Sequence, residues 1–260
     1  RSLANTGNRM ISNQFVSRIS LKTELIQSFD AYPLNLPAVR NLDAVELHPK
    51  VTFFVGENGS GKSTLLEALA VSLGFNAEGG SKNFRFDTRQ SHSNLHELLR
   101  VSKGIKKPRD GYFLRAESFF NVATEIERLD DEPFPAPPII DSYGKKSLHE
   151  QSHGESFLAL LMNRFGGQGL YILDEPEAAL SPQRQLVALS RLHDLVLDRS
   201  QFVIATHSPI LMAYPHAWIY ACTEDGLKRI EYKDIEHYRV MREFLLAPDE
   251  ALTRLLDRAS

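Results

Sequence analysis

Short apolar runs alternate along the chain with segments in which apolar residues recur every three to four positions. The apolar runs, which are typical of buried strands, fall at residues 15–21, 51–55, 170–173, 202–205 and 217–221. Helical periodicity is found at residues 62–73, 155–165, 182–197 and 236–246. In the third of these, Pro182 stands where a first-turn proline is favoured. The pattern predicts an α/β protein in which strands alternate with helices.

The stretch from Gly74 to Ser152 breaks this alternation. It is polar and ends in the proline-rich segment Pro133–Pro138, which cannot continue a helix or a central strand. The first nine residues are polar and precede Met10, where the domain can start. We therefore expect one α/β domain over residues 10–260, with an inserted helical or irregular lobe at about residues 75–150.

Composition and charge narrow the class of protein. A hydrophobic content of 42% with 15 Gly and 13 Pro excludes a disordered chain, a collagen-like repeat and a disulfide scaffold. The net charge of −3 gives no strong global attraction to nucleic acid or membranes. A single cysteine, Cys222, excludes an internal disulfide and fits a reducing compartment. No apolar run approaches the roughly 20 residues of a membrane helix, so we expect a cytoplasmic protein without a membrane partner.

Residues 56–64 carry the strongest motif. Their sequence satisfies G-x-x-x-x-G-K-[ST] and lies between a predicted strand and a predicted helix, where backbone N–H groups and the helix dipole can hold a phosphate. Lys62 is placed to neutralise the charge of the β- and γ-phosphates, and the Ser63 hydroxyl can ligate Mg²⁺. A glycine-rich turn without a ligand is the alternative. The motif predicts a nucleotide site made of Gly56, Glu57, Asn58, Gly59, Ser60, Gly61, Lys62, Ser63 and Thr64.

A second motif places two carboxylates after an apolar strand. Asp174 and Glu175 follow residues 170–173, and in isolation such a pair is usually a solvated turn. Beside a phosphate loop, Asp174 can hold the Mg²⁺ shell and Glu175 can polarise an attacking water. The pair therefore favours hydrolysis of a nucleoside triphosphate over transfer of a phosphoryl group to a second substrate.

Two weaker motifs complete the set. Ser152 and Gly154 stand at the start of the predicted helix 155–165, where a hydroxyl and free N–H groups can bind an anion or simply cap the helix. His207 follows the predicted strand 202–205, at the edge where strand ends gather around a ligand. A single histidine is otherwise more often structural.

Taken together and in this order, these motifs resemble those of the ABC-type ATPase superfamily over about residues 15–232. Residues 56–64 match Walker A, residues 170–175 Walker B, residues 152–156 the signature motif, residues 179–181 the D-loop, and His207 the switch histidine. The motifs look most like those of the non-transporter branch. That branch comprises recombination-repair, chromosome-maintenance and overcoming-lysogenization ATPases and small stand-alone bacterial ATPases.

Several positions depart from the superfamily pattern. His153 replaces one signature glycine, and Glu155 takes the last signature position. Ser181 replaces the D-loop aspartate, which puts the contact of that residue across a dimer in doubt. Gln90 is our candidate for the glutamine-loop residue, with an ordinary polar loop residue as the alternative.

The resemblance implies a fold and a mechanism. The fold is the ABC-type P-loop fold, a mixed sheet with flanking helices. Two chains would enclose two ATP molecules, each held by the Walker motifs of one chain and by Ser152 and Gly154 of the other. Glu175 would be the general base in the conversion of ATP and water to ADP and phosphate, and His207 would contact the γ-phosphate. Asp174 and Ser63 would hold Mg²⁺.

The motifs do not decide whether ATP hydrolysis acts on nucleic acid or on a protein partner. Residues 82–115 carry nine Lys or Arg against three acids, and the densest cluster is Lys103, Lys106, Lys107 and Arg109. This cluster can follow the phosphates of nucleic acid or can be a solvated face. We expect a soluble switch that acts on nucleic acid or on a separate effector protein. A transporter subunit and a module that uses ATP only structurally are the alternatives.

Overall fold

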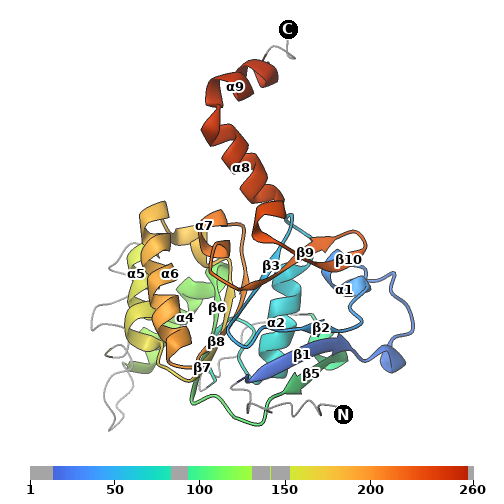
Figure 1. Ribbon diagram of the computed structural model, residues 1–260. Helices are drawn as coiled ribbons and strands as arrows, with labels where there is room; N and C mark the ends of the chain where they lie inside the picture. The colour runs from blue at the N-terminus through green and yellow to red at the C-terminus, as the bar shows by residue number, and fades with distance from the viewer. Residues whose placement is uncertain (1–13, 83–92, 131–140, 142–152, 257–260) are drawn as a thin grey trace, which may run out of the picture.

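The structure, a computed structural model, describes residues 14–82, 93–130, 141 and 153–256, and its strands form two sheets (Figure 1). The strands are β1 (Val16–Leu21), β2 (Val45–Glu46), β3 (Val51–Val55), β4 (Gly80–Ser81), β5 (Leu99–Lys103), β6 (Asp110–Arg115), β7 (Gly169–Asp174), β8 (Gln201–Ala205), β9 (Trp218–Thr223) and β10 (Gly226–Ile230). The central sheet has the order β10-β9-β3-β8-β7-β6-β4, and the small sheet has the order β2-β1-β5. The inner five strands of the central sheet are parallel, so their carboxyl ends share one edge.

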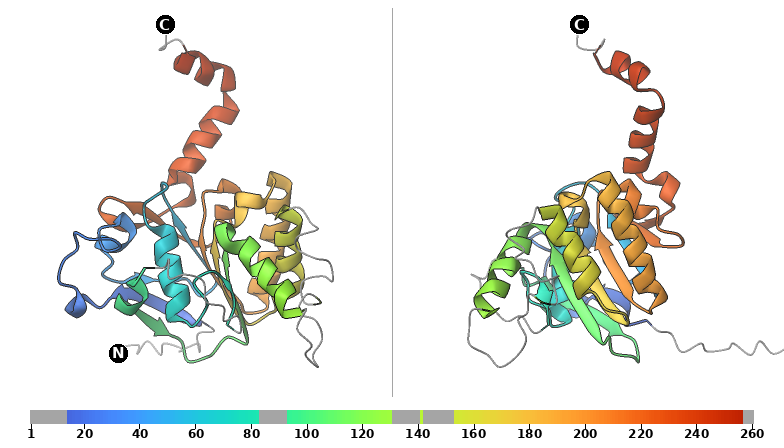
Figure 2. Two further views of the ribbon diagram at one scale, coloured as in Figure 1. Left: turned by 180° about the vertical axis from the view of Figure 1, so that it is seen from behind. Right: turned by 90° about the vertical axis from the view of Figure 1, so that its left-hand side faces the viewer.

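Helices cover both faces of the central sheet. They are α1 (Pro37–Arg40), α2 (Lys62–Ser72), α3 (Leu95–Leu98), α4 (Phe119–Asp130), α5 (His153–Ala159), α6 (Pro182–Leu197), α7 (Pro209–Met212), α8 (Glu236–Leu246) and α9 (Pro248–Leu256). Helix α2 lies between the central and small sheets, and α4, α5 and α6 cover the opposite face (Figures 1 and 2). The predicted α/β fold with a mixed sheet and flanking helices is confirmed.

The inner strands are buried on both faces, which explains why they read as continuous apolar runs. Along β3, Phe53 packs against the side of α4, α5 and α6, whereas Phe54 packs against the side of α2 and the small sheet. Both phenyl rings are fully buried. The side chains of a strand alternate between its faces, so each strand contributes to two separate cores.

Gln201 joins the small sheet to the central sheet from the first position of β8. Its side chain is fully buried, and its Oε1 accepts hydrogen bonds from the N–H groups of Phe15 (2.9 Å) and Val16 (3.0 Å). Its Nε2 donates to the carbonyls of Val16 (2.7 Å) and His48 (3.0 Å). Every polar position of this amide is used, as a buried polar side chain requires.

At the amino end of the sheet, Asp110 is held from three sides. It accepts hydrogen bonds from Tyr171 Oη (2.7 Å), Gly166 N (3.1 Å) and Arg164 Nη1 (2.9 Å). Burial alone would raise the pKa of this carboxyl, but the hydrogen bonds and the Arg164 charge bring the pKa below its usual value. The carboxylate therefore stabilises the start of β6.

The helix predicted over residues 155–165 is α-helical only in its first half. α5 ends at Ala159, and residues Leu160–Arg164 form a π-helical turn. A wider turn frees carbonyl groups from the α-helical pattern. The guanidinium of Arg191 on α6 donates to the carbonyls of Leu161 (3.3 Å) and Phe165 (2.9 Å) and so stabilises the turn.

Residues 75–150 are predicted to form an inserted lobe, but the described parts of this span belong to the two sheets. β5 pairs with β1 in the small sheet, and β6 lies between β7 and β4 in the central sheet. β6 is missing from the predicted strands because it follows a polar, basic stretch, although its four central residues are buried. Residues 83–92, 131–140 and 142–152 lie outside the described residues.

Helices α8 and α9 form an arm that projects from the body of the protein (Figures 1 and 2). Their described residues include no buried side chain, and the exposed ones include Val240, Phe244, Leu246, Leu252 and Leu255. Ile235, directly before α8, is fully buried and fixes the base of the arm. Among the described helices, none has both the length and the apolar character needed to cross a bilayer.

Candidate nucleotide site

The phosphate loop, residues 56–61, joins the carboxyl end of β3 to α2. Gly56 and Gly61 have positive φ angles of 148° and 95°. A Cβ on Gly61 would lie 2.9 Å from Cβ of Leu36, and one on Gly56 would lie 3.0 Å from Cβ of Cys222. Both positions therefore require glycine, for backbone conformation and for space.

Lys62, the first residue of α2, is folded back over this loop. Its Nζ donates to the carbonyls of Gly56 and Glu57, each at 2.8 Å, and the residue is only 4% exposed. Burial lowers the pKa of Lys62, whereas the nearby carboxylates of Glu175 and Asp174 act to raise it. The ammonium group is thus held where a bound triphosphate would replace backbone carbonyls as its partner.

Ser63 and Asp174 meet across the site although 111 positions separate them in sequence. Ser63 Oγ donates to Asp174 Oδ1 at 3.0 Å, and Asp174 is 4% exposed. Burial raises the pKa of Asp174 to about 7, against the lowering effects of the Ser63 hydrogen bond and the Arg115 charge. A hydroxyl and a carboxylate oxygen are ligands that Mg²⁺ accepts, with phosphate and water completing its shell. The residues fit this ion, and the described residues hold no cluster of three or more His, Cys, Asp or Glu suited to a metal.

Glu175 follows Asp174 in a strained conformation and faces His207. Its φ and ψ are both 51°, a left-handed conformation that is uncommon for a residue other than glycine. Its Oε1 lies 3.5 Å from His207 Nε2, an ion-pair distance. Among the described residues, this buried Nε2 atom has no close hydrogen-bond partner. Carboxylate and imidazole therefore point toward the same space.

Three residues that the sequence motifs do not include complete the site. Glu177 accepts a hydrogen bond from the backbone N–H of His207, and burial raises the pKa of its carboxyl. Cys222 packs against Gly56, and burial raises the pKa of its thiol to about 11. His237, in the first turn of α8, contacts His207. These contacts form only in the folded chain, so no local sequence signal marks them.

A cavity of about 430 Å³ opens beside the phosphate loop. Its walls come from the phosphate loop, the end of β9 and the first turn of α8, at residues 37, 55–60, 221–224, 230 and 235–237. Among the described residues, the helix α5 supplies no part of these walls. The cavity has the size of a small-molecule site.

The candidates for the signature motif, the D-loop and the glutamine loop either do not line the phosphate-loop cavity or lie outside the described residues. A Cβ on Gly154 would lie 2.5 Å from the carbonyl of Ala179 and 2.6 Å from Arg184 Nη1, so only glycine fits between α5 and the segment after Glu175. Ser181 caps α6, accepting a hydrogen bond from Arg184 N at 3.4 Å. Ser152 and Gln90 lie outside the described residues.

The basic segment, residues 103–109, lies at the opposite end of the central sheet. It precedes β6, whose start lies at the amino end, whereas the phosphate loop follows the carboxyl end of the parallel strand β3. Lys103, Lys106, Lys107 and Arg109 are exposed. The last three line a cavity of about 350 Å³ together with Phe15, Gln168 and Arg199. The structure thus adds Arg199 to the cluster found in sequence.

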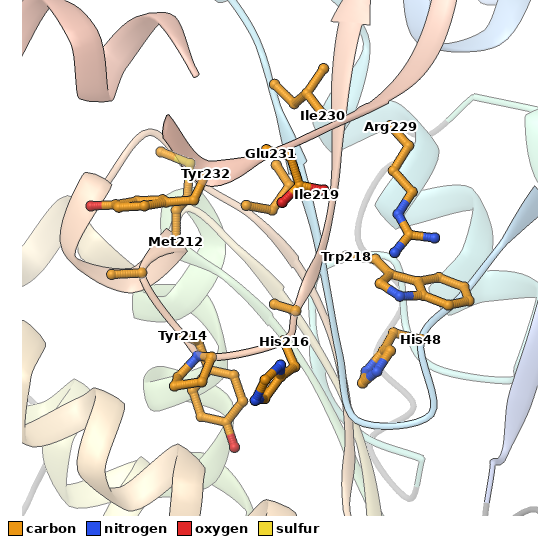
Figure 3. Close-up of a pocket in the computed structure, with 13 residues that line it drawn as sticks. His48, Met212, Tyr214, His216, Trp218, Ile219, Arg229, Ile230, Glu231 and Tyr232 are labelled. Atoms are coloured by element: carbon orange, nitrogen blue, oxygen red, sulfur yellow. The ribbon is translucent and has the colours of Figure 1, made fainter. Parts of the chain in front are cut away.

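A cavity of about 520 Å³ lies along β9 and β10 (Figure 3), and Ile230 is the one described residue that lines both this cavity and the cavity beside the phosphate loop. On one side the Arg229 guanidinium lies 4.2 Å from the centroid of the Trp218 ring, and His48 meets the same ring edge-on at 5.2 Å. Arg229 and His48 therefore already contact the indole ring of Trp218. None of the predicted site residues lines this cavity.

Comparisons with known proteins agree with this geometry. The AAA domain family matches residues 21–128. The DNA replication and repair protein RecF of Colwellia psychrerythraea (strain 34H / ATCC BAA-681) is 69% identical over 73 residues. The ABC-type ATPase fold is shared with MJ1267, an ATP-binding cassette of an ABC transporter, at a TM-score of 0.50 and 16% identity over 90% of this chain and 98% of that one. Together these matches support the ABC-type ATPase superfamily for this chain and, through the RecF segment, its non-transporter branch.

The match to RecF spans 27% of this chain and 18% of the RecF protein, so it concerns a small part of that protein. The SMC head domain from Thermotoga maritima is similar over 84% of this chain and all of that one, at 17% identity and a TM-score of 0.41.

Proposed function

We propose that this chain is an ABC-type ATPase that binds ATP with Mg²⁺ at the phosphate loop and hydrolyses it to ADP and phosphate. One observation carries the proposal: Lys62, the Ser63–Asp174 pair and the Glu175–His207 pair converge at the carboxyl end of the central sheet. They come from three separate segments of the chain. Each supplies a part that phosphoryl transfer to water requires.

In this proposal each residue of the site has a separate role in hydrolysis. The carboxylate of Glu175 accepts a proton from a water molecule while the water oxygen bonds to the γ-phosphorus and the bond from that phosphorus to the bridging oxygen breaks. Lys62 neutralises negative charge on the β- and γ-phosphates. A proton on His207 Nε2 can be donated to a γ-phosphate oxygen. Mg²⁺ held by Ser63 and Asp174 would supply further neutralisation of phosphate charge.

We propose further that two copies of the chain enclose the nucleotide. Gly154 packs against Ala179 and Arg184, and among the described residues its helix lines no wall of the phosphate-loop cavity. In this proposal, Ser152 and Gly154 approach the γ-phosphate bound to a second copy. Hydrolysis removes the γ-phosphate between the copies, so the dimer opens.

Nucleic acid is the partner we propose for this switch. The RecF protein matched over 73 residues is a DNA replication and repair protein, and the exposed basic segment offers cations for phosphates. Such binding needs no sequence recognition. A separate effector protein is the alternative occupant of the basic segment.

Replacement of the base tests the chemistry. Loss of a positioned general base costs about 10²–10⁴-fold in rate, so Glu175→Gln should lose most phosphate release while retaining ATP binding and accumulating as a dimer. Phosphate release, analogue binding and size-exclusion chromatography are measured with and without DNA. If the variant released phosphate at the parent rate, Glu175 would not be the base. ATP binding without turnover by the parent would instead favour a structural use of ATP.

Mixing two inactive variants tests action between copies. Lys62→Ala removes the phosphate-loop cation, and Ser152→Arg blocks the signature side. A mixed dimer keeps one intact composite site, so a mixture of the two variants should regain part of the parent phosphate release. No recovery at any mixing ratio, with both chains folded, would contradict the enclosed-nucleotide dimer.

A further inference from the structure

The first turn of the arm reaches the nucleotide site through a contact between two histidines. His237 Nε2 lies 3.1 Å from His207 Nδ1, with ring centroids 5.1 Å apart and ring planes at 61°. His237 also lines the cavity beside the phosphate loop. Nothing in the motif pattern assigns it a role. The contact joins two residues 30 positions apart, on different elements of the fold.

The protons that the two imidazole rings carry decide which ring donates the hydrogen bond between them. A neutral imidazole carries a proton on one nitrogen and a lone pair on the other. His207 Nε2 faces the carboxylate of Glu175 at 3.5 Å, and a carboxylate can only accept. With the His207 proton on Nε2, its Nδ1 must accept, and the donor is then Nε2–H of His237.

We infer that His237 is a positioning residue for His207, fixing its tautomer and ring orientation so that Nε2–H points toward Glu175 and the γ-phosphate position. The part concerning the γ-phosphate rests on the proposed function. Glu177 holds the backbone N–H of His207, and His237 holds the far side of its ring. Two points of attachment, one on the backbone and one on the ring, leave the imidazole little freedom.

Of the titratable residues that act on His207, His237 is the one that contacts the Nδ1 side of its ring. The titratable groups that act on His207 are Lys62 from α2, Glu175 from the end of β7 and His237 from α8. Lys62 Nζ is engaged by carbonyls of the phosphate loop, and Glu175 lies on the Nε2 side. Since His237 lies in the first turn of α8, it also joins the arm to the proposed catalytic residues.

Two substitutions at this position and a neighbouring control test the inference in the full chain. His237→Ala removes the donor, whereas the amide N–H of His237→Gln can still donate to Nδ1. Loss of a partner that orients a metal-bound histidine typically costs about 10–100-fold, and by analogy His237→Ala should lower kcat about tenfold or more. The KM for ATP should stay within about twofold. His237→Gln should recover most of the loss, and Arg239→Ala, an exposed residue of the same helix, should match the parent.

A measurement independent of turnover separates this inference from the proposed function. Long-range ¹H–¹⁵N spectra of histidine-labelled protein at neutral pH, without nucleotide, report the tautomer of each ring. The parent should show His207 protonated at Nε2 with a hydrogen-bonded Nδ1, and His237→Ala should lose that Nδ1 signature. If the parent hydrolyses no ATP but this change occurs, the proposed function fails and the positioning stands.

Two outcomes would overturn the positioning role. One is an unchanged His207 spectrum in His237→Ala, whatever the kinetics show. The other is a kcat for His237→Ala equal to that of an active parent. A loss of kcat that His237→Gln does not recover, with the His207 tautomer unaltered, falls under the first outcome and marks a general structural effect.

Discussion

The two ends of the central sheet each hold a carboxylate, the half-buried Asp110 at the amino end and the buried Asp174 at the carboxyl end, and the pKa values of the two shift in opposite directions. At the amino end, Asp110 accepts hydrogen bonds from Tyr171, Gly166 and Arg164, and its pKa is lowered. At the carboxyl end, Asp174 accepts one from Ser63, and burial raises its pKa to about 7. A buried charge without enough partners costs stability. The amino-end carboxylate therefore serves the fold, whereas the carboxyl-end carboxylate has room for the Mg²⁺ that we propose it binds.

The largest effect should come from removing the cation at the carboxyl end. Lys62→Met keeps the volume of the side chain but loses its charge-assisted contacts with phosphate, each worth about 1.5–3 kcal/mol. We expect the affinity for ATP to fall by about 10²-fold or more without loss of folded protein. Titration with a fluorescent ATP analogue and thermal denaturation measure both quantities.

Lys106→Met, at the amino end, is the matched control and should bind the analogue like the parent. Equal affinities for the parent and Lys62→Met would remove the electrostatic distinction between the two ends.

An intermediate effect, opposite in sign at the two ends, is expected from neutralising the carboxylates. The raised pKa of Asp174 means that the folded chain retains a proton that the unfolded chain releases between about pH 4 and 7, so the free energy of unfolding falls as pH rises through this window. Without nucleotide or divalent cations, Asp174→Asn should therefore stabilise the protein at pH 8, by on the order of 1–3 kcal/mol, and much less near pH 4.

Asp110→Asn should do the reverse. A carboxyl with a lowered pKa contributes stability above its unfolded pKa of about 3.9, and this contribution is lost as pH falls through the folded pKa. The variant should be destabilised by roughly 1–3 kcal/mol at pH 7, with a smaller difference below pH 4. Thermal denaturation of both variants across pH measures the contrast. The same sign of change in both at neutral pH would contradict it.

The smallest effect should come from the exposed charges of the amino end. Neutralising Lys103, Lys106, Lys107 and Arg109 together should flatten the salt dependence of nucleic-acid binding, with the log–log slope reduced by roughly 0.7–0.9 for each phosphate that is no longer neutralised. ATP hydrolysis without nucleic acid should be unchanged, since none of the four lies at the nucleotide site. Filter binding across a salt series measures the slope. If the parent binds neither DNA nor RNA at ~50 mM salt, a protein partner becomes the better explanation of the basic segment.

The sequence predicted those parts of the site that local pattern encodes. The strand before Gly56 and the helix after it follow from residues 51–73, and α6 has the predicted bounds Pro182–Leu197. Continuous apolar runs reveal strands buried on both faces. The Ser63–Asp174 contact also followed the predicted grouping of residues, although their roles in binding Mg²⁺ stay predictions.

Other parts of the site depend on contacts that no local pattern encodes. Glu177 lies in the short 3-10 turn after Glu175, and His237 lies in the first turn of α8. Each contacts His207, 30 positions away, only in the folded chain. β6 was obscured by the basic segment before it, and its pairing with β7 decides its conformation. Tertiary partners override local propensity at such positions.

The buried amide of Gln201 has a consequence for synthesis of the chain. Its hydrogen bonds to Phe15 and Val16 join residues 186 and 185 positions apart. A ribosome adding about 5–20 residues per second needs roughly ten to forty seconds to cover that distance. During this time the segment that becomes β1 has been made but lacks the amide that ties it to the central sheet. Although β1 can pair with β2 and β5 earlier, its attachment to the central sheet through Gln201 is delayed by this interval, and a chaperone that shields β1 would act during it.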